Sequence, residues 1–244
     1  MARRPASRPA RKSTPASGTT PAAPAAPGDD RAKIVAAFLA LLAEKPFEQI
    51  GFADIAQQAG VSLSQLRDQF AAKLPIYAAH LKAIDRAVLA EDLSDMAEEP
   101  PRERLFDVLM RRLEKLAPYR EALRSLMRSA RRNPPLALAL NGLAVRSQQW
   151  MLTAADIGAS GPRGMVRAQG LAVLFAAVLR TWIRDDDPGL ARTMAELDRA
   201  LGRGQRFAGL IDELCRIPSR LCRLRPRRRR RDEDDEDTQD AVAA

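Results

Sequence analysis

Residues 52–70 read FADIAQQAGVSLSQLRDQF, and this stretch decides the architecture of the N-terminal part of the chain. It contains two short helical patterns that meet at Ala59, Gly60 and Val61. Gly60 can adopt the left-handed backbone that ends a helix, and Ser62 is a good N-cap for the helix that follows. The pattern predicts a helix-turn-helix unit, a motif whose second helix can enter the major groove of DNA.

The side chains of this unit divide into an inward and an outward set. The inward set is small or apolar, as close packing of two helices requires, and comprises Ile55, Ala56, Ala59, Val61, Leu66 and Phe70. The outward positions of the second helix, with one lysine beyond it, are Leu63, Ser64, Gln65, Arg67, Gln69 and Lys73. The outward set is therefore the candidate surface for contacts with DNA.

The rest of the chain favours helices. Hydrophobic residues make up 46% of the 244 residues and aromatic residues only 5%, with Ala, Leu and Arg dominating. These three residue types lose little freedom in a helix, so we expect an all-α fold. Beyond the opening stretch, apolar periodicity and Pro or Gly breaks predict helices from Arg31 to Pro46, at Leu74–Leu93, and at about 102–116, 119–131, 136–156, 163–184 and 190–214.

Composition divides the chain into four parts. Residues 1–30 are a basic Pro/Ala-rich segment that we expect to be disordered. Residues 31–80 are the expected helix-turn-helix domain, and residues 81–215 the expected helical domain, with a break at the Glu98–Pro101 cluster. Residues 216–244 are expected to be a disordered tail, Arg-rich and then acidic.

The net charge of +9 indicates an anionic partner, but it is spread unevenly. Residues 1–30 carry +3, residues 216–240 carry +2, and the long middle part, 31–215, carries only +4. The last tail is open to two interpretations: its basic and acidic halves attract each other in solvent, or they form a clamp for nucleic acid that the acidic half regulates.

The motif Ile55-Ala56-x-x-Ala59-Gly60-Val61-Ser62, continued by Leu66, Phe70 and Lys73, resembles the TetR/AcrR family of transcriptional regulators over about residues 31–80. The resemblance implies a three-helix DNA-binding head followed by a C-terminal helical bundle. It also implies a homodimer on double-stranded operator DNA, with a small-molecule pocket and the dimer interface in the bundle. By position, Ser62, Ser64, Gln65 and Arg67 would contact bases or phosphates, and Lys73 a phosphate.

The sequence departs from the family pattern on its outward side. Arg67 stands where the family usually has Tyr, and Gln69 where an aromatic residue or His is usual. Ile50 and Gly51 occupy a region that often has Thr or Ser, and Ala53 a position that often has Arg. Since phosphate contacts supply most of the affinity for DNA, these departures predict weak binding unless the tails assist.

A second resemblance supports an alternative. Residues 182–198, WIRDDDPGLARTMAELD, are similar to the corresponding end of ubiquinone-biosynthesis lipid-binding proteins with a TetR-like fold. This similarity implies an accessory protein that does not bind DNA and that holds an isoprenoid lipid and a partner enzyme. The favoured interpretation is a DNA-binding regulator, expected to be a repressor, that a small hydrophobic ligand controls.

Candidate pocket residues in the helical domain are those with large apolar side chains: Met127, Trp150, Met151, Phe175 and Trp182. Each also fits a purely packing role. The arginines at positions 124, 128, 131 and 132 fit either a solvated helix face or a site for an acid. Asp185, Asp186 and Asp187 fit a turn with an N-cap better than a metal site. The helices at about 163–184 and 190–214 are the expected dimer interface.

Other classes of protein fit the sequence poorly. No apolar run approaches the roughly 20 residues of a membrane span, and the N-terminus lacks the apolar core of a secretory signal. Two cysteines, Cys215 and Cys222, and one histidine, His80, form no metal or redox motif. No catalytic triad or zinc-hydrolase motif can be assembled. We therefore expect a cytoplasmic protein that is not an enzyme and has no cofactor or metal.

Overall fold

Helices account for all regular secondary structure in the part of the chain that the structure, a computed structural model, describes: residues 27–92, 94–96 and 98–205. The all-α prediction is confirmed. Residues 1–26 of the first expected tail and all of the second, residues 216–244, fall outside the described residues, as do Cys215 and Cys222. The α-helices are α1 (Pro27–Glu44), α2 (Phe52–Ala59), α3 (Leu63–Gln69), α4 (Lys73–Leu89), α5 (Pro101–Leu116), α6 (Arg120–Arg132), α7 (Pro134–Ala154) and α8 (Gly161–Trp182), and residues 191–205 are also helical.

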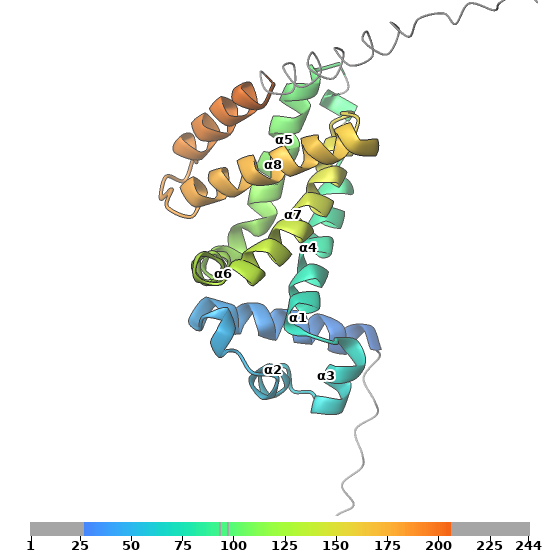
Figure 1. Cartoon of the computed structure of the whole chain (residues 1–244), viewed down its shortest axis with the longest axis vertical. Coiled ribbons are helices and arrows are strands. Elements are labelled where there is room, and N and C mark those ends of the chain that lie inside the picture. The colour runs from blue at the N-terminus through green and yellow to red at the C-terminus, as the bar shows by residue number, and fades with distance from the viewer. Residues whose placement is uncertain (1–26, 93, 97, 206–244) are drawn as a thin grey trace, which may run out of the picture.

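The helices α1, α2 and α3 form a head at one end of the molecule (Figure 1). Ile34, Phe38 and Leu42 are fully buried on α1, as the i, i+4 pattern predicts. Ile55 from α2 and Leu66 from α3 meet this face. The head therefore has an apolar centre of its own, although its core continues into the rest of the molecule.

The helix α4 runs from the head into the body formed by α5 to α8 and residues 191–205 (Figure 1). Its buried side chains include Ile76 near the head and Ile84 and Val88 further along. The boundary expected after residue 80 falls inside this continuous helix. Leu89, the last residue of α4, is 37% exposed.

A second contact joins the head to α6. The backbone N–H of Phe47 donates to Ser129 Oγ at 3.1 Å, and the Ser125 hydroxyl donates to the Lys45 carbonyl at 3.0 Å. Both serines are buried, and their bonds to Phe47 and Lys45 place them on the side of α6 that packs against the end of α1. The end of α1 is therefore tied to the body by hydrogen bonds as well as by apolar packing.

The helix α8 crosses the body and packs along α7 (Figure 1). Its buried residues recur at helical spacing and include Ala168, Leu171, Phe175, Val178 and Trp182. By length and composition alone this helix could cross a membrane, but a core helix passes the same test. The stripe that packs within the protein fits the role of a core helix.

The acidic group after α8 forms a turn and caps the next helix. Asp185 Oδ2 accepts from the N–H of Thr193 at 2.8 Å and from its hydroxyl at 2.6 Å. Asp187 Oδ2 accepts from the N–H of Ala191 at 3.1 Å. The hydrogen bonds from the hydroxyl and the N–H of Thr193 lower the pKa of Asp185. The interpretation of these aspartates as a turn with a cap is consistent with this geometry.

Candidate DNA-binding unit and ligand cavity

The turn between α2 and α3 has the backbone that the sequence predicts. Gly60 has φ 66° and ψ 32°, the left-handed region, where a side chain would be strained. The N–H of Val61 donates to the Ala56 carbonyl at 3.0 Å, and the N–H of Gly60 donates to the Gln57 carbonyl at 3.2 Å. These bonds use the free carbonyls at the end of α2 and set the direction in which α3 leaves the turn.

Two predicted DNA-contacting residues hold the start of α3 together. Ser62 Oγ accepts from the Gln65 N–H at 3.1 Å, and Gln65 Oε1 accepts from the Ser62 N–H at 2.8 Å. This reciprocal pair is a capping box. The Gln65 amide also donates to Asp30 Oδ2 on α1 at 3.2 Å. In this structure both side chains stabilise the head, and their amide and hydroxyl groups already have partners.

The predicted cations of the unit also have internal partners. Lys73 Nζ donates to the carbonyls of Phe47 and Ile50, each at 2.9 Å, and lies 4.5 Å from the Phe47 ring centroid. Burial lowers the pKa of Lys73. Arg67 Nη1 donates to the Ala71 carbonyl at 3.1 Å, but its side chain remains exposed. Of the two, Arg67 is the cation that can reach an external anion by a small movement.

The remaining predicted contacts form the free outer surface of α3. Leu63 is 58% exposed, and Ser64 is also exposed. Gln69 is half-buried, and its backbone carbonyl accepts from Arg31 Nη1 at 3.2 Å. The structure therefore presents Leu63, Ser64 and Arg67 to the outside, while Ser62, Gln65 and Lys73 make contacts within the head.

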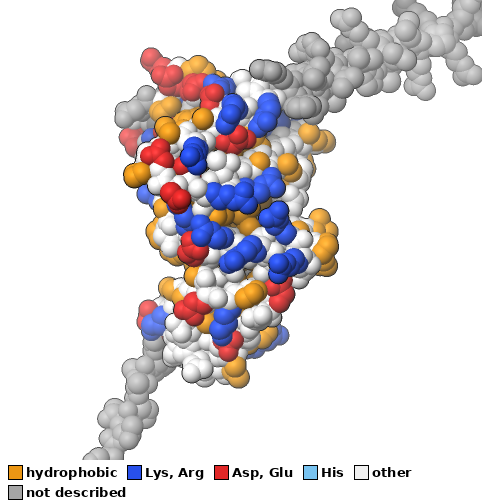
Figure 2. Space-filling view, turned by 90° about the vertical axis from the view of Figure 1, so that its left-hand side faces the viewer, with side chains coloured by type: hydrophobic (Ala, Val, Ile, Leu, Met, Phe, Trp, Pro, Cys, Tyr) orange, Lys and Arg blue, Asp and Glu red, His pale blue; other side chains and the backbone are white. Residues whose placement is uncertain are grey.

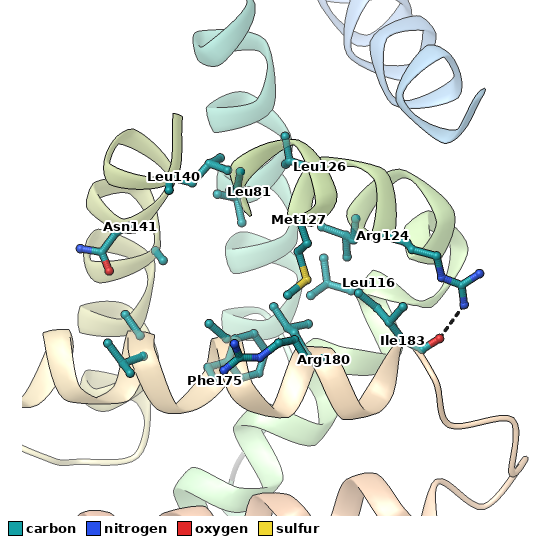
Figure 3. Close-up of a pocket in the computed structure, with 18 of the residues that line it drawn as sticks. Leu81, Leu116, Arg124, Leu126, Met127, Leu140, Asn141, Phe175, Arg180 and Ile183 are labelled. Carbon is teal, nitrogen blue, oxygen red and sulfur yellow. Dashed lines mark hydrogen bonds between the residues drawn. The ribbon is translucent and has the colours of Figure 1, made fainter. Parts of the chain in front are cut away.

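A cavity of about 720 Å³ lies in the body between α4, α5, α6, α7 and α8. This volume is within the range of about 300–1,000 Å³ that is usual for small-molecule sites. Figure 3 shows Leu116, Met127 and Phe175 in the space between the helices. Its walls are mainly apolar, and the described residues that line it include no Asp or Glu.

The predicted pocket residues separate into three groups. Met127 and Phe175 line the cavity. Met151 and Trp182 are fully buried in the core and do not line it, and Trp182 packs beneath the Arg120 guanidinium, 4.7 Å from its ring centroid. Trp150 is 58% exposed and points away from the core. Met151, Trp182 and Trp150 therefore lie outside this cavity. Met151 and Trp182 share the helix faces of the lining residues Ala144 and Phe175 but lie two turns further along, whereas Trp150 is exposed to solvent.

A buried polar group at the cavity was not predicted. Arg112, 2% exposed, pairs with Asp85 at 3.2 Å, and Asp85 accepts from the Ser147 hydroxyl at 2.6 Å. Arg112 Nε and Nη1 and Gln148 Oε1 are buried without a hydrogen-bond partner among the described residues. The sequence held a signal, since Arg112 falls in the inward phase of α5 with Leu105, Val108 and Leu109.

Burial also changes the acid–base chemistry of the neighbouring residues. It raises the pKa of Tyr77 to about 12 and, with the Arg112 charge, lowers the pKa of His80 to about 4. His80 packs edge to face on Tyr119 at 4.4 Å between centroids. At neutral pH both Tyr77 and His80 are therefore uncharged, and they lie beside the ion pair of Arg112 and Asp85.

The described residues contain no group of three or more His, Cys, Asp or Glu side chains that could hold a metal ion. Besides the buried Arg112, five exposed or partly exposed arginines line the cavity: Arg124, Arg128 and Arg131 from α6, Arg180 from α8, and Arg184 from the turn after α8. We refer to these five residues as the arginine rim.

Comparisons with known proteins support the fold. No protein-family model matches the chain, and no curated protein matches it. Among solved structures, a TetR transcriptional regulator from Nitrosomonas europaea ATCC 19718 is 21% identical, with a TM-score of 0.55 over 72% of this chain and 97% of that chain. A TetR transcriptional regulator from Rhodococcus sp. RHA1 is 18% identical, with a TM-score of 0.52 over 72% of this chain and 96% of that chain. The chain therefore has the fold of the TetR-family transcriptional regulators.

Proposed function

We propose that this protein is a DNA-binding transcriptional regulator, acting in the cytoplasm as a homodimer and as a repressor. The observation that carries the proposal is the α2–α3 unit, in which a left-handed Gly60 and a Ser62 cap hold α3 with its outer surface free. Leu63, Ser64 and Arg67 on that surface are the side chains assigned to base edges and phosphates.

The proposed control is a small hydrophobic ligand in the cavity. The helix α4 supports this proposal because it begins at Lys73 in the head and contributes Tyr77 and Leu81 to the cavity wall. A ligand that favours one position of α4 would change the placement of the head. In a homodimer this would change the spacing of the two heads, which must match half-sites about 34 Å apart.

The proposed dimer interface lies on α8 and residues 191–205. Exposed apolar side chains on these helices support it, namely Met165, Val166 and Val173 on α8, and Met194. A second copy that packs on these side chains would remove them from water and form a four-helix bundle from two copies.

The alternative of a lipid-binding accessory protein in ubiquinone biosynthesis is not favoured, because the similar structures are those of transcriptional regulators. The direct test is binding of the purified full-length protein to the DNA upstream of its own gene at low salt. We expect saturable binding that weakens as salt increases. Absence of binding at low salt would refute the regulator function.

A further inference from the structure

The arginine rim carries charge that the described residues do not neutralise. Arg124 has an acidic partner, since its Nη1 lies 2.9 Å from Glu121 Oε1, and its Nη2 donates to the Ile183 carbonyl at 2.6 Å. The other four, Arg128, Arg131, Arg180 and Arg184, are exposed and have no ion pair with a described residue. Figure 2 shows Lys and Arg side chains gathered across the middle of this face around a hydrophobic strip.

A smaller hollow adjoins the cavity at the same place. It measures about 210 Å³ and is lined by Arg180, Thr181, Arg184 and Arg192. Arg180 and Arg184 therefore line both spaces. An apolar chamber thus shares a wall with a hollow that offers three guanidinium groups and a hydroxyl, all of which can donate hydrogen bonds to an anion.

We propose that the cavity takes an amphipathic anion, with its apolar body among the leucines of α4, α5 and α6 and its carboxylate or phosphate head at Arg180 and Arg184. The inference deepens the proposed function by naming the class of its ligand. The walls beside Leu81, Leu116 and Met127 receive the apolar body (Figure 3). The carboxylate or phosphate of the ligand remains partly in water, so its charge is not fully desolvated.

The charge balance places the carboxylate or phosphate of the ligand at the arginine rim and not at the buried end of the cavity. Arg112 is already paired with Asp85, so that cluster is neutral overall. A second carboxylate there would leave a buried negative charge without a cation, and burial of such a charge is costly. At the rim an anion meets several unpaired cations and no acidic lining residue. The two ends of the site thus differ in charge as the two ends of an amphipathic anion do.

The test compares ligands with the same tail and different heads on the full-length protein. Dodecanoate, dodecyl phosphate, 1-dodecanol and inorganic phosphate are titrated below their micelle concentrations, by calorimetry, into the native chain and two variants. One variant is Arg180→Gln/Arg184→Gln. The control is Arg163→Gln, which removes an exposed charge from the opposite end of the same helix.

We expect both anionic amphiphiles to bind the native chain at least about tenfold more tightly than dodecanol, and inorganic phosphate alone to bind much more weakly. The preference for an anionic head should decrease with salt, disappear in the double variant and persist in Arg163→Gln. Binding of dodecanol by the double variant shows that its cavity is intact. If only dodecanoate or only dodecyl phosphate binds more tightly than dodecanol, the anionic group of the ligand is assigned as a carboxylate or as a phosphate, respectively.

Equal affinity for the anions and the alcohol, or a preference that survives in the double variant, would overturn the inference. The first result is expected if another part of the chain neutralises the rim. A failure of the proposed regulator function is distinguished from a failure of this inference, because the regulator function is tested by DNA binding and not by the amphiphile titration. A chain that prefers anionic amphiphiles but binds no DNA would retain this inference and lose the proposed function.

Discussion

Lys73 points back into the head, with its Nζ 2.9 Å from the carbonyl oxygen of Phe47 and 4.5 Å from the centroid of the Phe47 ring. It thereby fixes the turn Phe47–Gln49 that connects α1 to α2. The same ammonium group also binds the Ile50 carbonyl. A residue that the family resemblance assigns to a phosphate thus has a structural role in this chain.

The first prediction follows from that role. Lys73→Met keeps much of the apolar stem but leaves two half-buried carbonyls without their charged donor. We expect a loss of about 1.5–3 kcal/mol in the free energy of unfolding, measured by urea denaturation. Lys82→Met is the matched control, since Lys82 is exposed on the same helix, and it should stay within about 0.5 kcal/mol of the native chain. Equal stability of the two variants would contradict the structural role of Lys73.

The second prediction concerns the cation that remains available to DNA. Arg67→Gln should weaken binding to all DNA sequences and reduce the slope of log K against log salt by about 1, because one phosphate contact is lost. Arg86→Gln removes the same charge from an exposed position at the far end of α4 and should leave the slope unchanged. Identical slopes in the two variants would mean that Arg67 contacts no phosphate.

The third prediction separates two serines of α3. Ser62 caps the helix, so Ser62→Ala should cost about 1 kcal/mol in the free energy of unfolding. Ser64 is exposed and makes no cap, so Ser64→Ala should change stability by less than about 0.5 kcal/mol and act on DNA affinity instead. Urea denaturation and DNA titration of both variants check this division. A destabilised Ser64→Ala protein would show that the two roles are not separate.

Much of the fold could be predicted because its signals are local. Pro46, Pro118, Pro134 and Gly60 mark where helices stop or start, and the inward phase of α1 places Ile34, Phe38 and Leu42 in the core. The candidate DNA-contacting surface was predicted from the same helical periodicity, as the side of α3 opposite to its inward residues. These features depend on neighbours within one or two helical turns.

The rest depends on contacts between distant segments. Lys73 binds carbonyls more than 20 residues away, so its direction follows from tertiary packing. Trp150 and Trp182 both lie near the C-terminal ends of long helices, but one is exposed and the other fully buried. The arginine rim forms only because α6, α8 and the turn after α8 line one cavity. Periodicity within one helix cannot show which helix will face it.

The fourth prediction concerns the buried pair of Asp85 and Arg112. Asp85→Asn removes the negative charge and leaves a buried guanidinium without its counter-ion, which should cost about 3–5 kcal/mol. Arg112→Met leaves the carboxylate unpaired in the same way. The double variant should lose less than the sum of the two, with a coupling energy of order 1–3 kcal/mol in urea denaturation. Strict additivity would show that the two side chains do not stabilise each other.

The fifth prediction uses the single histidine of the chain, His80. Burial and the Arg112 charge lower its pKa from 6.5 to about 4. Between these values the unfolded chain binds a proton at His80 and the folded chain does not. The free energy of unfolding should therefore fall as the pH decreases from about 6.5 towards 4, by roughly 3 kcal/mol in total.

His80→Leu provides the control, because it removes this proton without adding a charge at the site next to Tyr119. Between pH 6.5 and 5, above the usual pKa range of the carboxylates, the variant should show a nearly flat stability curve where the native protein shows a slope. The ring-proton resonance of the one histidine gives the folded-state pKa directly by NMR titration. A midpoint near 6.5 would contradict the prediction, because it would require water to reach the imidazole that Tyr77 and Tyr119 enclose.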